Sequence, residues 1–329
     1  MKQYFVWIFL GLMLSGLLGL FSISFAEEGK WTRKADMPTA RWLFSASVVD
    51  GKIYVIGGAS DFNANQTVQA VEEYDPVTDT WTRKADMPTP RTWLSTSAVN
   101  GKIYAIGGRI ADRALATVEE YDVVTDKWEK KKEMPTARWA LSTAVVDGKI
   151  YAIGGWLGWP NKSFSTVEEY DPVRGWTRKA DMPTPRFALS ASVVNGNIYA
   201  IGGWGNNWFL GAVEAYNPAT NRWTKKADIP NADGLFYTQT VNGKIYAMYG
   251  GSWTVEEYDA VTDTWTTKAS IPTVRGGGFS ISAVNGKIYA IGGRIGFDVL
   301  STVEEYDTGL AIEAKGKLAA SWGKLKARD

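Results

Sequence analysis

The sequence predicts an all-β fold in which six four-stranded antiparallel sheets close into a ring, that is, a six-bladed β-propeller. Three observations lead to this prediction. The chain holds six copies of one pattern of short strand-like segments, and such a repeat is typical of closed repeat arrays. In each copy an Asn-Gly or Asp-Gly dipeptide separates two β-rich segments, as in a tight hairpin. Each copy also carries a glycine pair, at 57/58, 107/108, 154/155, 202/203, 292/293 and, in altered form, 250/251.

The clearest copy covers residues 91–135 and shows how each strand is predicted. The first strand is 94–99. The second, 103–106, is rich in β-branched and aromatic residues, as a half-buried strand is. The glycine pair that follows permits an unusual turn. The third strand is 117–122, and the fourth surrounds Trp128 and stops at a Met-Pro pair.

The glycine pair, the tyrosine of the third strand and the tryptophan of the fourth strand together resemble the Kelch repeat. The resemblance extends over residues 30–307, and six copies of the motif in register are a specific signal. It implies a β-propeller. It implies no particular activity, because one fold hosts many functions.

The two ends of the repeat region complement each other. Trp31 lies in a fourth strand that no earlier strands of a blade precede, whereas 303–307 is a third strand that no fourth strand follows. We therefore predict that the outer strand at Trp31 completes the last blade and closes the ring. An open blade would expose backbone donors and acceptors along its edge.

Composition excludes several classes of function. Lysine plus arginine (36) nearly equals aspartate plus glutamate (35), so net charge does not favour nucleic acid as a partner. The chain has no cysteine and no histidine, which excludes disulfides, thiol nucleophiles, Ser-His-Asp triads and histidine-ligated metals. The copper chemistry of some Kelch propellers needs both residue types and is excluded too. We expect no metal site and no cofactor.

The segments outside the repeats predict export. Residues 1–26 combine a lysine, an apolar stretch and a small-x-small cleavage site, as a secretory signal peptide does. An uncleaved anchor is the alternative, because the apolar stretch approaches spanning length. After cleavage we expect residues 27–309 to form a monomeric propeller outside the cytoplasm, without a membrane contact. The basic tail, 310–329, is either docked on the propeller, loose, or an interaction segment.

Strand direction divides the loops between two faces. The Asn-Gly hairpins and the turns between third and fourth strands share one face, the bottom face, and are near copies of one another. The connections from second to third strand, and from fourth strand to the next blade, share the top face and differ in length and content. A repeat protein that varies only one face is expected to use it, so we expect ligands at the top face.

Tryptophans concentrate in the top connections. Of sixteen in the chain, six belong to fourth strands. Eight fall in or just after a top connection, namely Trp42, Trp93, Trp139, Trp156, Trp159, Trp204, Trp208 and Trp253. We interpret them as a stacking surface for a sugar ring, a peptide aromatic group or an apolar ligand. The alternative is that they plug the channel mouth and pack between blades.

Arginines occupy equivalent positions where the chain enters the innermost strands. They are Arg41, Arg91, Arg138, Arg186 and Arg275. We expect them near the central channel, where clustered guanidinium groups would bind a carboxylate. The alternative is that each arginine caps the carbonyls of its own turn. In the fifth copy Asp233 replaces the arginine and Tyr249 a glycine, and the sixth copy has the glycine triplet 276–278, so we expect the ligand in this irregular sector.

Two functions fit these residues. The first is an exported binding propeller whose top face takes a glycan or an acidic protein segment. The second is an enzyme similar to the sialic-acid mutarotases, exported Kelch propellers whose chemistry needs an arginine clamp and one acid/base. Asp233, Asp61 or Asp298 would have to act as that group, because histidine is absent. The repeated Glu-Glu pairs are scaffold, because neighbours on a strand point to opposite faces. No residue is predicted to be catalytic, so binding is favoured.

Overall fold

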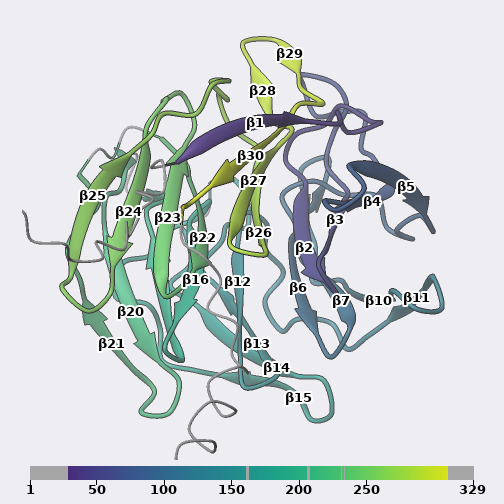
Figure 1. Cartoon of the computed structure of the whole chain (residues 1–329). Coiled ribbons are helices and arrows are strands. Elements are labelled where there is room, and N and C mark those ends of the chain that lie inside the picture. The colour runs from purple at the N-terminus through teal and green to yellow at the C-terminus, as the bar shows by residue number, and fades with distance from the viewer. Residues whose placement is uncertain (1–28, 161–162, 206–207, 231, 233, 310–329) are drawn as a thin grey trace, which may run out of the picture.

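The computed structural model describes residues 29–160, 163–205, 208–230, 232 and 234–309, and all its regular elements are strands. Figure 1 shows the sheets arranged around a central axis. The predicted export segment, 1–26, and the basic tail, 310–329, lie outside the described residues. Within the described ranges, no helix is long and apolar enough to cross a membrane.

The six blades are four-stranded antiparallel sheets, each listed here from the innermost strand outward. Blade 1 is β2 (Ser45–Val49), β3 (Lys52–Ile56), β4 (Val71–Asp75) and β5 (Thr80–Lys84). Blade 2 is β6 (Ser95–Val99), β7 (Lys102–Ile106), β10 (Val118–Asp122) and β11 (Lys127–Lys130). Blade 3 is β12 (Ser142–Val146), β13 (Lys149–Ile153), β14 (Val167–Asp171) and β15 (Gly175–Arg178).

The second half of the ring repeats this order. Blade 4 is β16 (Ser190–Val194), β17 (Asn197–Ile201), β20 (Val213–Asn217) and β21 (Arg222–Lys225). Blade 5 is β22 (Phe236–Val241), β23 (Lys244–Tyr249), β24 (Val255–Asp259) and β25 (Thr264–Lys268). Blade 6 is β26 (Ser280–Val284), β27 (Lys287–Ile291), β30 (Val303–Asp307) and β1 (Lys30–Lys34). The predicted all-β, six-bladed propeller is confirmed.

Three small hairpins extend the top connections of alternate blades. They are β8 (Arg109–Ile110) with β9 (Arg113–Ala114), β18 (Trp204–Gly205) with β19 (Trp208–Phe209), and β28 (Arg294–Ile295) with β29 (Asp298–Val299). Blades 2, 4 and 6 carry them between their second and third strands. In Figure 1 the hairpin β28–β29 stands clear of the body of the ring.

The last blade takes its outer strand from the start of the described chain. β1 pairs antiparallel with β30, with Trp31 opposite Tyr306 and their ring centroids 4.9 Å apart. In Figure 1 the purple β1 lies beside the yellow-green β30. Beyond β1, the Ala35 N–H donates to Asp79 Oδ1 (2.9 Å), and Trp81 Nε1 donates to the Ala35 carbonyl (3.0 Å). These bonds tie the segment after β1 to blade 1.

The apolar core lies between consecutive blades. Ile56 of blade 1, for example, shares a cluster with Leu94 and Ile103 of blade 2. Across the junction of the first and last blades, Phe44 packs with Tyr289. The inner strands line a central channel, where the Ser45 and Thr96 hydroxyls, among others, bond neighbouring blades (2.9 Å). This packing leaves the connecting loops to form the two faces.

Candidate ligand-binding face

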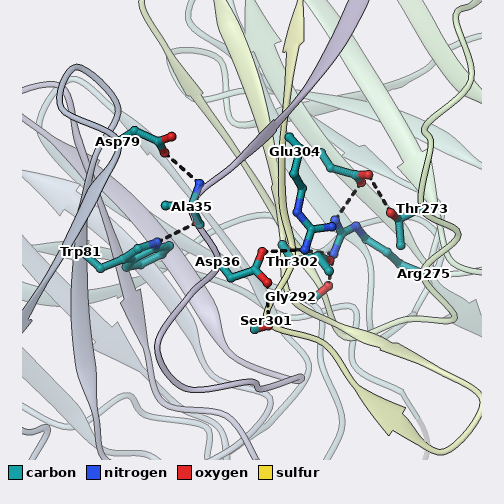
Figure 2. Close-up of polar contacts among 11 residues, drawn as sticks. Ala35, Asp36, Asp79, Trp81, Thr273, Arg275, Gly292, Ser301, Thr302 and Glu304 are labelled. Carbon is teal, nitrogen blue, oxygen red and sulfur yellow. Dashed lines mark hydrogen bonds and ion pairs between the residues drawn. The ribbon is translucent and has the colours of Figure 1, made fainter.

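The repeated arginines are buried inside the blades and do not reach the channel mouth. Arg41, Arg91, Arg138, Arg186 and Arg275 are each at most 1 % exposed. Figure 2 shows the arrangement at Arg275, whose guanidinium binds the Glu304 carboxylate (2.9 Å) and the carbonyls of Gly292 and Thr302. The Thr273 hydroxyl donates to the same carboxylate (2.6 Å).

Four other blades repeat this ion pair. The pairs are Arg41–Glu72 (2.6 Å), Arg91–Glu119 (2.7 Å), Arg138–Glu168 (2.8 Å) and Arg186–Glu214 (3.1 Å). A buried charge is costly unless it is paired, and these guanidinium groups are already neutralised by glutamates of their own blades. The prediction that the arginines form an anion site at the mouth is therefore wrong for these five residues, and the alternative of a cap within each blade describes them better.

The Glu-Glu pairs are scaffold, as predicted. The first glutamate of the pair binds the buried arginine in blades 1, 2, 3 and 6, and the second binds the lysine that follows the Asn-Gly or Asp-Gly hairpin. Glu73, for instance, binds Lys52 (2.8 Å) and Lys84 (3.1 Å). Burial alone would raise the pKa of Glu73, but hydrogen bonds from Lys52, Tyr54 and Lys84 outweigh it and lower that pKa. Lys52 and Lys84 are thus neutralised by Glu73.

Blade 5 departs from this pattern. Asp233, which replaces the arginine in sequence, lies outside the described residues. Glu256 is nevertheless 1 % exposed, and its hydrogen-bond donor among the described residues is the Thr267 hydroxyl, at 3.1 and 3.2 Å. Tyr249 extends β23 by one residue and packs its ring on Phe236, with centroids 5.4 Å apart. This blade is built differently beside the channel mouth.

The predicted tryptophans divide into packed and exposed groups on the top connections. Trp139 is buried and lies 5.6 Å from Trp93 and 4.9 Å from Trp156, centroid to centroid. Trp42 and Trp204 are half-buried. The remaining three project from loop tips and are exposed by 86 % (Trp159), 76 % (Trp208) and 55 % (Trp253). Exposed indoles of this size on one face indicate a contact surface.

Two arginines that the sequence analysis missed add positive charge to this face. The Arg294 guanidinium lies 4.5 Å from the ring centroid of Trp42 and 4.9 Å from that of Phe62. Arg109 lies 4.8 Å over Trp139. Burial lowers the pKa of Arg109, and Asp112 opposes this shift. Within the part of the chain that the structure describes, neither guanidinium has a carboxylate at ion-pair distance. Both arginines directly follow a glycine pair, and this position in the repeat is the sequence feature that identifies them.

A ring of backbone hydrogen bonds joins the blades at the channel mouth. Leu43 N–H donates to the Gly278 carbonyl (2.8 Å), Trp93 to Leu43 (2.9 Å), Ala140 to Trp93 (2.9 Å), and Ala188 to Ala140 (2.7 Å). The four donors have φ between 51° and 56°, a left-handed conformation that these inter-blade bonds hold in place. The mouth is therefore tightly fixed from blade 6 through blade 1 to blade 4.

The ring is interrupted at blade 5. There the Leu235 carbonyl accepts from Gly250 N–H (3.0 Å). The Gly278 N–H donates instead to the Tyr237 hydroxyl oxygen (2.6 Å). Blade 5 therefore differs from the other blades both in its sequence and at the mouth, where a side chain accepts a bond in place of a backbone carbonyl.

A cavity of about 460 Å³ lies over this sector. The connection from β23 to β24 is only 250–254, whereas hairpins stand on the neighbouring blades 4 and 6. Trp204 and Phe209 line the cavity from blade 4, with centroids 4.5 Å apart, and Arg294 lines it from blade 6. Gly234, Gly250 and Gly276 contribute backbone to the lining, and Phe187 and Leu235 complete it. A short loop between two hairpins thus creates a hollow with an aromatic side and a cationic side.

Comparison with protein families agrees with this architecture. The model described as the KLHDC2/KLHL20/DRC7 Kelch-repeats domain matches residues 18–155. The Kelch motif matches residues 140–183, 185–230 and 275–309. The chain belongs to the Kelch-repeat β-propeller family.

A search of solved structures shows the same fold. The structure titled "Structure of YjhT" superposes with a TM-score of 0.71 and 15 % identity, covering 82 % of this chain and 95 % of the other. At this identity the likeness concerns the fold alone. The comparison with curated protein sequences gave no match.

What this Kelch propeller can do chemically follows from its top face. The described residues that line the cavity include no carboxylate. Asp61 accepts a hydrogen bond from Gln66 N–H (2.7 Å) within its own loop, and Asp298 is exposed in β29. The aromatic and cationic lining suits stacking and anion binding, and these described residues offer no acid/base beside the cavity.

Proposed function

We propose that this Kelch propeller is an exported, monomeric binding protein whose top face binds an acidic glycan. Its partner is neither nucleic acid nor membrane, and its ligand occupies the cavity over blade 5. A single observation carries the proposal. Arg294 rests on Trp42 without a carboxylate partner among the described residues, at the edge of a cavity whose opposite side is Trp204 and Phe209. An aromatic side receives the face of a sugar ring, while the guanidinium receives its acidic group.

The contrast between the two faces supports this choice. On the bottom face Lys52, Lys102 and Lys287 each lie within 2.6–2.8 Å of a glutamate carboxylate. The exposed apolar side chains of that face are single valines in the turns, such as Val77 and Val124. Guanidinium groups stacked on aromatic rings and clustered exposed aromatics therefore coincide on the top face, where each strengthens the attraction for an acidic ring-bearing ligand.

The proposal is tested with an array of neutral and acidic glycans that also carries polyglutamate peptides. We expect acidic glycans to be retained, and titration calorimetry on the best of them to show at least a tenfold loss of affinity in Arg294→Gln. Arg83→Gln is the matched control, because Arg83 is exposed on β5 and paired with Asp86, away from the cavity. Retention of polyglutamate alone would identify an acidic protein segment as the ligand and refute the glycan. Retention of nothing acidic would refute the function.

The alternative is a mutarotase resembling those that act on sialic acid. It needs an acid/base near the anomeric oxygen, and the described residues lining the cavity supply none. Asp233, outside the described residues, immediately precedes the cavity residue Gly234 in sequence. NMR measurement of N-acetylneuraminate anomerisation decides: unchanged kinetics in the presence of the protein exclude the enzyme, whereas acceleration that Asp233→Asn abolishes would establish it.

A further inference from the structure

Tyr237 is the exceptional residue of the channel mouth. It pairs with Met248 at the position where the other inner strands place Ser45, Ser95, Ser142, Ser190 and Ser280. Its ring packs on Phe279, with centroids 4.0 Å apart, and it lines the upper channel, a cavity of about 200 Å³. Tyr237 therefore places a phenol where the other five blades place a serine hydroxyl, and its side chain is longer than theirs.

The Tyr237 hydroxyl is held in place and keeps its proton available. Its oxygen accepts from Gly278 N–H at 2.6 Å, and no residue that the structure describes accepts its proton. Burial raises the pKa of Tyr237 to about 12, while the Gly278 hydrogen bond and the charge of Arg294 act in the opposite direction. The group is thus protonated at neutral pH, and it is a hydrogen-bond donor without an acceptor.

The glycine triplet allows this arrangement. A Cβ at Gly278 would lie 2.9 Å from Trp42 Cε3, so a side chain there would push Trp42 away. Gly277 and Gly278 both have positive φ, which a side chain would strain. Without side chains here, Trp42 and Tyr237 both approach the blade-6 edge of the mouth. The triplet, which the sequence marks only as irregular, provides the space between them.

Arg294 supplies a second donor that lacks an acceptor. Its Nε is buried and has no hydrogen-bond partner among the described residues. Its Nη1 donates to the Gly296 carbonyl (3.2 Å), and its guanidinium is held over Trp42 and Phe62. Its backbone N–H donates to the Gly277 carbonyl (3.2 Å), one residue before Gly278, whose N–H binds the Tyr237 hydroxyl. Two donors without acceptors at the same edge of the mouth offer an acceptor-rich group a place to bind.

We propose that Tyr237 and Arg294 form a subsite for one carboxylate, and that the ligand is a ring-bearing monocarboxylic acid whose ring lies in the cavity over blade 5. The upper channel and this cavity share Leu235 in their linings, so the subsite lies where the two spaces adjoin. One cation and one neutral donor match a single carboxylate better than a polyanion, which needs more positive charge. The inference rests on the proposed function and deepens it by naming the ligand class and the residues that select it.

The test uses two matched pairs of probes on the whole chain. The first is 4-fluorobenzoate with its neutral isostere 4-fluorobenzamide, measured by ¹⁹F NMR line broadening. The second is methyl glucuronide with methyl glucoside, measured by saturation transfer, and it separates sugar acids from aromatic acids as the source of the carboxylate. We expect at least one acid to bind at least tenfold more tightly than its neutral partner.

The variants locate this preference. Arg294→Gln and Tyr237→Phe should each reduce acid binding at least tenfold and leave neutral-probe binding unchanged. Arg109→Gln, which changes the other stacked arginine, should retain the preference. Since Tyr237→Phe also removes the acceptor of Gly278 N–H, its melting temperature is measured in parallel, and Arg294→Gln tests the subsite even if Tyr237→Phe does not fold.

The outcomes separate this subsite from the proposed function. Equal binding of acid and neutral probes, or a preference that survives in Arg294→Gln, overturns the subsite, and so does the absence of binding by both acids. Each of these results leaves the glycan array free to succeed. Conversely, a carboxylate preference at this subsite together with an array that retains no glycan would refute the proposed glycan ligand and keep the subsite.

Discussion

Arg294 rests on Trp42: the guanidinium carbon of the blade-6 arginine lies 4.5 Å from the ring centroid of the blade-1 tryptophan. This contact crosses the junction between the first and last blades. It holds a cation at the channel mouth without a neutralising carboxylate among the described residues. Because the indole face attracts the cation without cancelling its charge, the guanidinium remains able to bind an anion.

Removing the indole tests this role. Trp42→Ala should weaken binding of the best acidic glycan about 3- to 30-fold, because a cation–π contact contributes about 0.5–2 kcal/mol. Titration calorimetry measures the effect. Trp93→Ala is the control, since Trp93 stacks on Trp139 and not on Arg294. Equal losses in the two variants would show that the contact of Trp42 with Arg294 is not what matters.

The buried arginines should affect stability and not ligand binding. Arg91→Ala leaves Glu119 buried without its partner, and we expect it to lower the free energy of unfolding by about 3–5 kcal/mol. The double variant Arg91→Met/Glu119→Leu should regain at least half of that loss, because it removes both charges. Denaturant titration gives these values. A folded Arg91→Ala protein that has lost ligand affinity more than twofold would return this arginine to the binding site.

The repeat pattern predicted the fold well because it is local and periodic. The hairpin at Asn100 shows why: its φ is 51° and that of Gly101 is 75°, and the dipeptide chosen for such turns is visible in the sequence. Six such signals in register specify six blades. The repeat pattern does not show in the same way which residue a long polar side chain will bind.

The arginines illustrate this limit. Arg41 enters the inner strand beside the channel, yet its side chain turns into the blade and meets Glu72, thirty-one positions along the chain. Sequence spacing gives the position of Arg41 but not this direction, which is set by the buried carboxylate. The sequence does not single out Arg294, because its partners Trp42 and Phe62 come from another blade. The sequence analysis therefore named arginines that are buried in the blades and missed the two that stack on aromatic rings of the top connections.

The outer strand β1 should be needed for a stable ring. A protein that begins at residue 36 lacks β1 and exposes the edge of β30, so we expect it to aggregate or to unfold without a cooperative transition. A protein that begins at residue 27 lacks only the predicted export segment, and it should melt cooperatively. Calorimetry and size-exclusion chromatography compare the two. A stable monomer that begins at residue 36 would contradict the importance of the pairing between Trp31 and Tyr306.

We expect the free energy of unfolding to depend on pH only in the acidic range. Burial alone would raise the pKa of Glu120, yet hydrogen bonds from Lys102 and Tyr104 and the charge of Lys131 lower it below its ordinary value of 4.5, and Glu169 behaves alike. A carboxylate whose pKa is lower in the folded state binds more protons when unfolded, so its contribution is present above pH 4.5 and is lost as pH falls through the folded value.

Between pH 6 and 8 no such change is expected, because the chain contains no histidine. Thermal melts from pH 8 to pH 2.5 should therefore show a constant melting temperature down to about pH 5, followed by a steep decrease. The variant Glu120→Gln should show a shallower decrease in acid. A transition near neutral pH, or a decrease that Glu120→Gln leaves unchanged, would contradict this account of the lysine and glutamate networks.

The most direct test of the central claim, that the top face over blade 5 takes the ligand, is an NMR titration of the tryptophan indole N–H signals with the best acidic glycan. The indoles mark two surfaces, since Trp42 and Trp204 lie at the mouth and the cavity, whereas Trp81, Trp128 and Trp223 lie in outer strands. The account predicts that the first two signals shift with one common affinity and that the outer-strand signals stay in place. Shifts confined to Trp81, Trp128 and Trp223, with those of the top face unmoved, would contradict it.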